Sequence, residues 1–261
     1  GLPVVGTIPT FKKTAGKDRP EGAQFVPLRD EPDGPVAEAF RALRSNLKFL
    51  IRTKEGGCTL AVTSSGPGEG KSMTNVDVAL SFAIAGKRVL LVDADMRRGS
   101  VSEYLGLPTA LGLSDALQDR VQWREALVDS CHPSMAVLPA GAVPASPGDL
   151  LASPRAAELI DEMRRDYDLV VFDVPPVLAV ADIECVAAQL DIVLLLCRSA
   201  KTTDATVRHS VNRLQQVGAN VVAAVLNGVS LRKGPGGYGY GYGYGYGNTN
   251  GNETSRKERV A

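Results

Sequence analysis

The amino-acid sequence predicts an α/β protein with a parallel β-sheet and helices on both of its faces. Three observations support this fold class. Short runs rich in valine and leucine recur along the chain, most are separated by segments of helical periodicity, and the runs are apolar throughout instead of alternating with polar residues. Such strands are buried on both faces, as in a sheet whose parallel strands are joined by crossover helices.

Length and composition limit the function classes. The 261 residues, 44% of them hydrophobic, are enough for one large α/β domain. Lysine plus arginine and aspartate plus glutamate number 29 each, so the overall charge favours neither nucleic acid nor an anionic membrane as a partner. No apolar run approaches the roughly 18 residues of a membrane span, and we expect no signal peptide in the opening residues. Three of the four cysteines lie in or beside apolar runs and the fourth has no partner at metal spacing, which favours buried, reduced thiols and therefore the cytosol.

The composition and the periodicity of the sequence change near residue 36. Residues 1–35 are rich in proline and carry one short apolar stretch, so we expect an extended arm here rather than a packed element. From Val36 the apolar and the charged residues follow helical spacing on two different sides, namely Phe40, Leu43, Leu47 and Leu50 against Glu38, Arg41, Arg44 and Lys48. This amphipathic helix opens the predicted folded domain, residues 36–231.

Six apolar runs follow as predicted strands, with a helix from about Lys71 to Ala85 after the first of them. The runs are CTLAVTSS (58–65), RVLLVDAD (88–95), SMAVLPA (134–140), DLVVFDVPP (168–176), DIVLLLCRS (191–199) and NVVAAVLN (220–227). After Leu231 the apolar periodicity stops. Residues 232–261 lack the aliphatic content that would offset the entropy of ordering, so we expect a disordered tail rich in tyrosine and glycine.

The strongest local motif is SSGPGEGKS, residues 64–72, between a predicted strand and a predicted helix. Its glycines let backbone N–H groups surround a phosphate, Lys71 reaches the outer phosphates, and the Ser72 hydroxyl can ligate Mg²⁺. The nucleotide-binding candidates are Gly66, Pro67, Gly68, Glu69, Gly70, Lys71, Ser72 and Met73. Ser65 stands where the strict pattern has glycine, and a glycine-rich turn with a chance lysine is the alternative.

Acidic residues end two of the predicted strands. Asp93 and Asp95 follow one apolar run and Asp173 follows another, at the carboxyl edge where parallel sheets bind ligands. A single aspartate at such a place is commonly a helix cap or a turn residue. Because Mg²⁺ prefers carboxylates, water and phosphate oxygens, three of them beside a phosphate loop indicate a magnesium–nucleotide site.

The motifs resemble the Walker A, Walker A′ and Walker B motifs of bacterial tyrosine kinases. These cytoplasmic P-loop kinases are attached to polysaccharide chain-length regulators and are related to MinD/ParA-type ATPases. The resemblance runs from about Val36 to the C-terminus and includes the phosphate loop, the D-x-D-x-R of 93–97, the D-x-P-P from Asp173, the terminal tyrosine cluster and the E-x-x-R-x-x-R of Glu38, Arg41 and Arg44. The opening LPVVGTIP is similar to the segment that follows the second membrane span in fused regulator–kinase chains.

The resemblance implies an ATP- and Mg²⁺-dependent protein tyrosine kinase at the cytoplasmic face of the plasma membrane, serving capsular or exopolysaccharide synthesis. Lys71 would clamp the phosphates, Asp93 would accept the phenol proton, Ser72, Asp95 and Asp173 would hold the metal, and Asn227 would contact the base. The sequence does not separate the roles of Asp93 and Asp95. The implied phosphoacceptors are Tyr238, Tyr240, Tyr242, Tyr244 and Tyr246.

The implied partners are further copies of the chain in a ring, a membrane chain-length regulator and a cognate tyrosine phosphatase, but no nucleic acid. Glu38, Arg41 and Arg44 would form the ring contacts and bring each tail to a neighbouring active site, although the same residues also describe an ordinary solvated helix face. Tyr104 and Tyr167 are expected to be packing residues.

Two other functions remain open. A MinD/ParA-type ATPase switch would modify no protein, but its variant loop carries a lysine where this chain has Gly66, and it gives the tyrosine repeat no role. An adhesive tail would use the alternating tyrosines for aromatic contacts without catalysis.

Overall fold

The computed structural model describes residues 1–12, 19–51, 56–108 and 111–230. The chain divides into two units, Gly1–Ser230 and Leu231–Ala261, and the predicted tail therefore lies outside the described residues. In the described part, no helix is both long enough and apolar enough to cross a bilayer.

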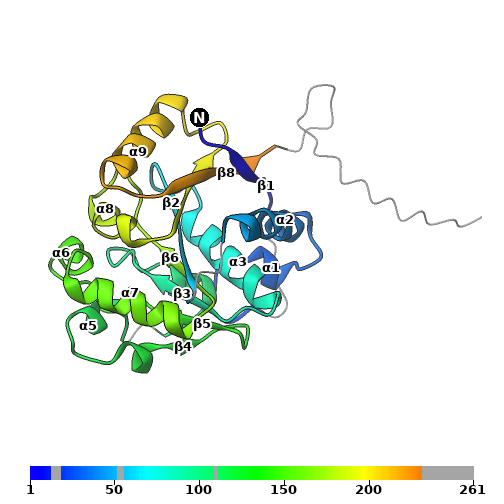
Figure 1. Cartoon of the computed structure of the whole chain (residues 1–261). Helices are drawn as coiled ribbons and strands as arrows, with labels where there is room; N and C mark the ends of the chain where they lie inside the picture. The colour runs from blue at the N-terminus through cyan, green and yellow to red at the C-terminus, as the bar shows by residue number, and fades with distance from the viewer. Residues whose placement is uncertain (13–18, 52–55, 109–110, 231–261) are drawn as a thin grey trace, which may run out of the picture. The chain divides into compact units, whose positions relative to one another are not determined.

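An eight-stranded sheet forms the centre of the first unit, in the order β1-β8-β7-β2-β6-β3-β5-β4 (Figure 1). All neighbouring strands are parallel except β4 and β5. The strands are β1 (Val4–Pro9), β2 (Cys58–Ser64), β3 (Val89–Asp93), β4 (Val128–Asp129), β5 (Met135–Leu138), β6 (Leu169–Asp173), β7 (Ile192–Arg198) and β8 (Val221–Val229). All six predicted strands are present, and the predicted fold class is confirmed.

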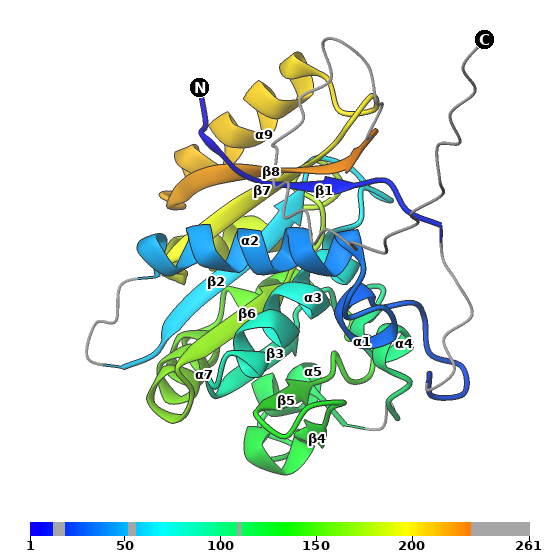
Figure 2. The same cartoon turned by 90° about the vertical axis from the view of Figure 1, so that its right-hand side faces the viewer.

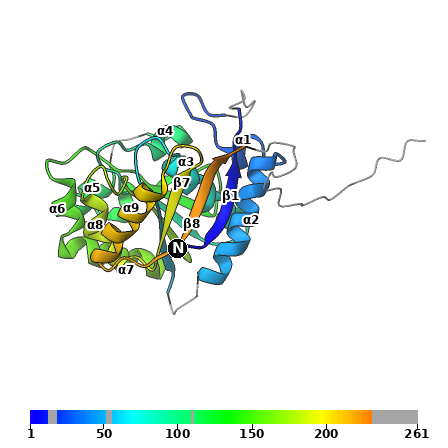
Figure 3. The same cartoon turned by 90° about the horizontal axis from the view of Figure 1, so that it is seen from above.

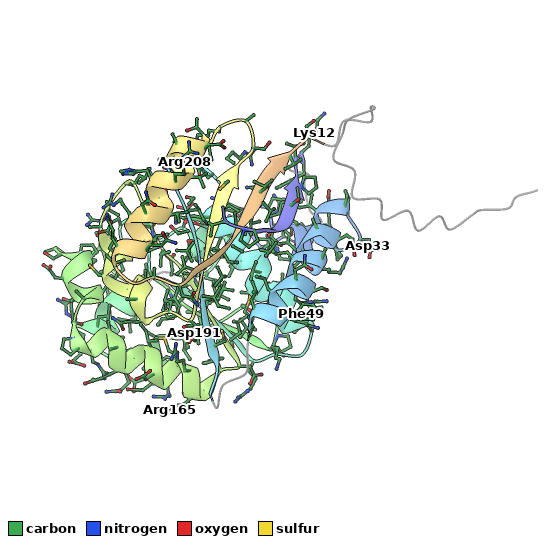
Figure 4. All side chains as sticks on the ribbon, turned by 45° about the horizontal axis from the view of Figure 1, so that its top comes forward. Lys12, Asp33, Phe49, Arg165, Asp191 and Arg208 are labelled. Atoms are coloured by element: carbon green, nitrogen blue, oxygen red, sulfur yellow. The ribbon has the colours of Figure 1, made fainter. Side chains whose placement is uncertain are left out.

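Helices cover both faces of the sheet (Figures 1 and 3). On one face lie α1 (Pro27–Asp30), α2 (Pro35–Leu50), α3 (Lys71–Ile84) and α4 (Val101–Leu105). On the other lie α5 (Leu113–Leu117), α6 (Pro147–Leu151), α7 (Pro154–Asp166), α8 (Asp182–Val186) and α9 (Asp204–Gln216), with the short 3-10 helices Trp123–Ala126 and Ala187–Gln189. Figure 4 shows Asp33, just before α2, and Arg208 on α9 on opposite sides of the molecule.

Two apolar cores result from this layering. Side chains of one strand alternate between them, so Leu60 and Val62 of β2 pack with α2 and α3 while Ala61 packs on the opposite face. Figure 2 looks onto the first layer, where α2 runs beside β1 and α3 lies next to it. The predicted apolar stripe of α2 is buried there at Phe40, Leu43 and Leu47. Tyr104 and Tyr167 pack against the two cores, as expected.

The expectation of an extended arm over residues 1–35 is wrong for the described part of that segment. Val4–Pro9 is an edge strand paired in parallel with β8, and Phe25, Val26 and Leu28 are buried. The proline content suggested an unpacked arm, but Pro3 and Pro9 lie at the ends of an edge strand, where a missing N–H is tolerated. The folded unit therefore begins near residue 1 instead of at residue 36.

Candidate active site

The phosphate loop connects β2 to α3 at the carboxyl edge of the sheet. Gly68 and Gly70 adopt positive φ angles of 72° and 100°, conformations that favour glycine. A Cβ on Gly70 would also collide with the side-chain amide nitrogen of Asn227. No side chain caps the N-terminus of α3, so its first N–H groups are available to a phosphate. The loop has the backbone form that the sequence predicts.

Ser65 departs from the strict motif without disturbing the loop. Its φ is not positive, so the position does not require glycine. Its N–H donates to Glu69 Oε2 at 3.2 Å, and its hydroxyl accepts a bond of 2.9 Å from Ser210 on α9. The serine therefore anchors the start of the loop to the body of the domain.

Lys71 lies among the predicted acidic residues. Its Nζ is 2.8 Å from Asp95 Oδ2 and 3.3 Å from Asp173 Oδ1, and its side chain is 11% exposed. Burial by itself would lower the pKa of Lys71, but the charges of Asp173 and Asp95 raise this pKa above its ordinary value. The ammonium is thus charged and positioned at the end of the loop.

Asp93 and Asp173 are register partners on the adjacent strands β3 and β6. Burial and the neighbouring charge of Asp173 raise the pKa of Asp93 well above its ordinary value. Burial also raises the pKa of Asp173, against the opposing effect of Lys71. Asp93 Oδ2 accepts the N–H of Val101 at 3.0 Å, which fixes the carboxyl beside α4. Of the three aspartates, Asp93 is the one without a direct ion pair to Lys71.

Two residues that the sequence analysis did not single out complete the site. Asn75 Nδ2 donates to Asp173 Oδ1 at 2.8 Å, and Ser100 Oγ donates to Ser72 Oγ at 2.9 Å. Asn75 follows Lys71 by one helical turn, a spacing that could have drawn attention to it. Ser100 lies in the loop after β3 and carries no motif signal. Both residues hold a predicted metal ligand in place.

The residues fit a magnesium–nucleotide complex. No group of three or more histidine, cysteine, aspartate or glutamate side chains in the described ranges is arranged to hold a metal alone, so the missing ligands would be phosphate oxygens and water. Asp93 Oδ1 and Asp173 Oδ2 are buried and have no hydrogen-bond partner. Buried carboxylate oxygens are normally satisfied, and these two are available to a cation or to a hydroxyl group.

Asn227 and Met73 are both predicted nucleotide-binding residues, but their side chains lie in different surroundings. Asn227 is buried within β8, its Nδ2 donates to the Glu69 carbonyl at 2.8 Å, and its Oδ1 has no partner. That oxygen is therefore left with unused capacity to accept a hydrogen bond. The Met73 side chain is buried in the core between α2, α3 and the sheet, so only its backbone can serve a nucleotide.

The predicted ring residues lie apart from this site, on α2. Arg41 pairs with Glu38 of the same helix at 3.2 Å and also donates to the Pro32 carbonyl. Arg44 Nη1 donates to the Ser81 carbonyl of α3 at 2.6 Å, and its Nε is buried without a partner. The five tail tyrosines lie outside the described residues.

A phosphate loop, an uncapped helix behind it and carboxylates at neighbouring strand ends define a P-loop nucleotide-binding protein. A family model described as an AAA domain matches residues 58–221. The solved structure of the septum site-determining protein MinD from Pyrococcus horikoshii, complexed with Mg-ADP, shares the fold with a TM-score of 0.57 at 20% identity over 66% of this chain and 70% of that one.

Sequence comparison identifies the family to which the chain belongs among P-loop nucleotide-binding proteins. EpsB of Ralstonia solanacearum is 37% identical over 232 residues, or 87% of this chain and 31% of EpsB. The tyrosine-protein kinase YwqD of Bacillus subtilis is 35% identical over 78% of this chain and 85% of its own. The kinase domain of the Escherichia coli tyrosine kinase ETK superimposes with a TM-score of 0.83 at 31% identity, covering 92% of this chain and 95% of that domain. The chain belongs to the bacterial tyrosine-protein kinase family, which confirms the predicted resemblance.

Proposed function

We propose that this protein is an ATP- and Mg²⁺-dependent tyrosine kinase that phosphorylates the tyrosines of its own C-terminal cluster. The observation that carries the proposal is the position of Lys71 at the end of the phosphate loop, paired with Asp95 and Asp173. Family membership supports the reaction type, because relatives that share this domain are named tyrosine-protein kinases.

The chain's own groups account for nucleotide binding. The N–H groups of Gly66 and of residues 68–73 would surround the phosphates, with the positive end of the α3 dipole behind them. Lys71 would exchange its carboxylate partners for phosphate oxygens. Asn227 would accept a hydrogen bond from the base amine through its unpartnered Oδ1.

Ser72, Asp95 and Asp173 would hold magnesium, directly or through water. When bound, the ion supplies charge neutralisation for the transferring phosphoryl group. The hydroxyl of Ser72 receives a hydrogen bond from Ser100, and Asp173 receives one from Asn75, so both candidate ligands are held before any ion arrives. This preorganisation reduces the rearrangement needed at the site.

Asp93 is our choice for the proton acceptor. Its Oδ2 is occupied by the N–H of Val101, whereas its buried Oδ1 has no hydrogen-bond partner and would be the atom that takes the proton of the phenol. Asp95 is already engaged by Lys71, which favours a role at the metal. The proton of the tyrosine would pass to Asp93 as the phenolic oxygen bonds to the γ-phosphorus and ADP leaves.

The acceptors in this proposal are Tyr238, Tyr240, Tyr242, Tyr244 and Tyr246, presented in trans within a ring. Glycine between the tyrosines allows an extended chain to enter a cleft without side-chain clashes. Glu38, Arg41 and Arg44 would form the ring contact by exchanging the pair inside one helix for a pair between neighbouring copies.

We further propose that the domain acts at the cytoplasmic face of the plasma membrane with a chain-length regulator, in capsular or exopolysaccharide synthesis, and that a tyrosine phosphatase reverses the modification. The chain matches only 31% of the length of EpsB, so a relative can carry this domain beside other regions.

Intact-mass measurement tests the proposed reaction. Protein pretreated with a tyrosine phosphatase and then incubated with Mg-ATP is expected to gain up to five phosphates, since the tail has five tyrosines. Lys71→Met should gain none, and a variant with all five tail tyrosines changed to phenylalanine should bind nucleotide but gain little. Hydrolysis of ATP without added mass would support the ATPase switch, and equal incorporation by the phenylalanine variant would exclude the tail as the main substrate.

A further inference from the structure

Lys201 contacts the phosphate loop through the backbone of Pro67. It follows β7, far from the loop in sequence, and its Nζ donates to the Pro67 carbonyl at 3.0 Å. A Cβ placed on Gly68 would have the same ammonium as its nearest neighbour, at 3.7 Å. Lys201 is exposed, and among the described residues no carboxylate forms an ion pair with it. Its positive charge is therefore free to act on the loop.

The contact between Lys201 Nζ and the Pro67 carbonyl also affects the direction of the Gly68 N–H, because of peptide geometry. The carbonyl of Pro67 and the N–H of Gly68 belong to one trans peptide unit and point in opposite directions. A donor that holds the Pro67 carbonyl therefore directs the Gly68 N–H away from Lys201, and this N–H would be presented to a phosphate oxygen on the opposite side of the peptide unit. A cation on the carbonyl also polarises the peptide unit and strengthens its N–H as a donor.

Two other loop carbonyls are held in the same way. Ser64 Oγ donates to the Gly66 carbonyl and Asn227 Nδ2 donates to the Glu69 carbonyl, both at 2.8 Å. The carbonyls of residues 66, 67 and 69 are thus each held by a side chain, and Lys201 supplies the charged donor of the three.

The turn that carries Lys201 is itself fixed to the loop and to β8. Ala200 adopts a φ of 61°, which is uncommon for a residue with a side chain and is maintained here by surrounding bonds. The Ser199 N–H donates to the Asn227 carbonyl at 2.8 Å, and Thr202 Oγ1 donates to Glu69 Oε1 at 2.9 Å. The lysine therefore extends from a preorganised turn, although its own side chain is on the surface.

We propose that Lys201 is a positioning residue for the nucleotide. It holds the 67–68 peptide with its N–H toward the phosphates and adds a positive charge near them, and this inference rests on the proposed nucleotide site. The residue acts on binding of the phosphates and not on the proton transfer, because it contacts the loop and none of the three aspartates.

The test compares Lys201→Met with Lys201→Arg and with the control Lys87→Met, an exposed lysine before β3. Calorimetry measures ADP affinity with and without Mg²⁺, and kinetics separate KM for ATP from kcat. We expect Lys201→Met to weaken ADP binding and raise KM by about five- to tenfold, with kcat at saturating ATP within about twofold of the wild type. Lys201→Arg should recover most of the affinity, and Lys87→Met should match the wild type.

The outcomes separate this inference from the proposed function. Unchanged ADP affinity in Lys201→Met, or a lower kcat at unchanged KM, would overturn the positioning role while leaving the kinase proposal intact. A wild-type protein that binds no ADP would overturn both. Thermal melting of each variant without nucleotide checks the fold, and equal melting temperatures with unequal ADP affinity support the inference.

Discussion

Asn75 and Asp173 are joined by a hydrogen bond of 2.8 Å between α3 and the end of β6. The same asparagine exchanges hydrogen bonds with both backbone groups of Val62, at 3.2 Å and 2.9 Å. One buried amide therefore connects the helix behind the phosphate loop to β2 and to a candidate metal ligand. The site and the core share this residue.

Asn75→Ala should consequently lower the free energy of unfolding by about 3 kcal/mol, because several buried polar groups lose a partner together. Urea denaturation measures this change. Asn220→Ala is the matched control, since Asn220 makes one exposed bond to the Asp191 carbonyl and should change stability by less than about 1 kcal/mol. Equal effects of the two substitutions would contradict the assigned role of Asn75.

Asp77 should make the stability of the domain depend on pH. It is buried in α3, its Oδ1 accepts the Leu28 N–H at 2.9 Å, and its Oδ2 has no partner. Burial raises its pKa well above the ordinary value, although the bond from Leu28 and the charge of Arg29 act in the opposite direction. Because the pKa of Asp77 is higher in the folded than in the unfolded chain, its protonated carboxyl contributes to the free energy of unfolding. This contribution is fully present below the unfolded pKa and is lost as pH rises through the folded pKa.

Asp77→Asn is expected to remove the loss of stability that Asp77 causes as pH rises. The measurement is the free energy of unfolding at pH 5 and pH 8 for both proteins, because other titrating groups cancel in the difference. Stability should fall less between the two pH values in Asp77→Asn than in the wild type. An identical change in both proteins would show that Asp77 has the same proton affinity in the folded and unfolded chain.

The Arg97–Asp182 pair should stabilise the loop that follows Asp93 and carries Asp95. The guanidinium donates twice to the carboxylate, at 2.7 Å and 2.9 Å, and links that loop to the start of α8. Asp182 is 5% exposed and Arg97 is 46% exposed, so solvent weakens the pair. Arg97→Ala should lower stability by about 1 to 2 kcal/mol, chiefly because Asp182 remains buried without its partner.

A double-mutant cycle with Arg97→Ala and Asp182→Ala measures the coupling, expected at about 1 kcal/mol. Arg97→Lys should recover only part of it, since an ammonium does not match the two-point geometry. Additive effects of the two single substitutions would mean that the contact contributes no coupling.

Gly70→Ala should weaken nucleotide binding more than it weakens the fold. The substitution adds the strain of a positive φ and pushes a methyl group against the Asn227 amide. Gly86→Ala is the control, because Gly86 has a φ of 84° but no atom within 4 Å of a Cβ. Both variants should lose about 1 kcal/mol of stability from backbone strain, and only Gly70→Ala should lose ADP affinity by about tenfold or more. Similar ADP affinities of the two would count against a tight contact at Gly70.

The sequence predicted the six central strands, the phosphate loop and the grouping of Lys71 with Asp95 and Asp173, because each depends on local pattern or on the shared carboxyl edge of parallel strands. It did not predict Asn75 or Ser100 as site residues, since their partners lie on other elements and become neighbours only in the folded chain. It misjudged residues 1–35 because an edge strand needs little more than a short apolar stretch once a partner strand is available.

That edge strand also sets an order for assembly during synthesis. β1 pairs with β8, and residues 10–220 separate the two strands in the chain. A ribosome therefore delivers the first strand long before its partner, and this pairing has to wait for nearly the whole domain. Long-range parallel pairing is slow to form, so the last edge of the sheet closes when the chain up to Val229 has emerged. A chain that ends before β8 would leave both β1 and β7 with an unpaired edge, and such truncated chains should be the ones that aggregate.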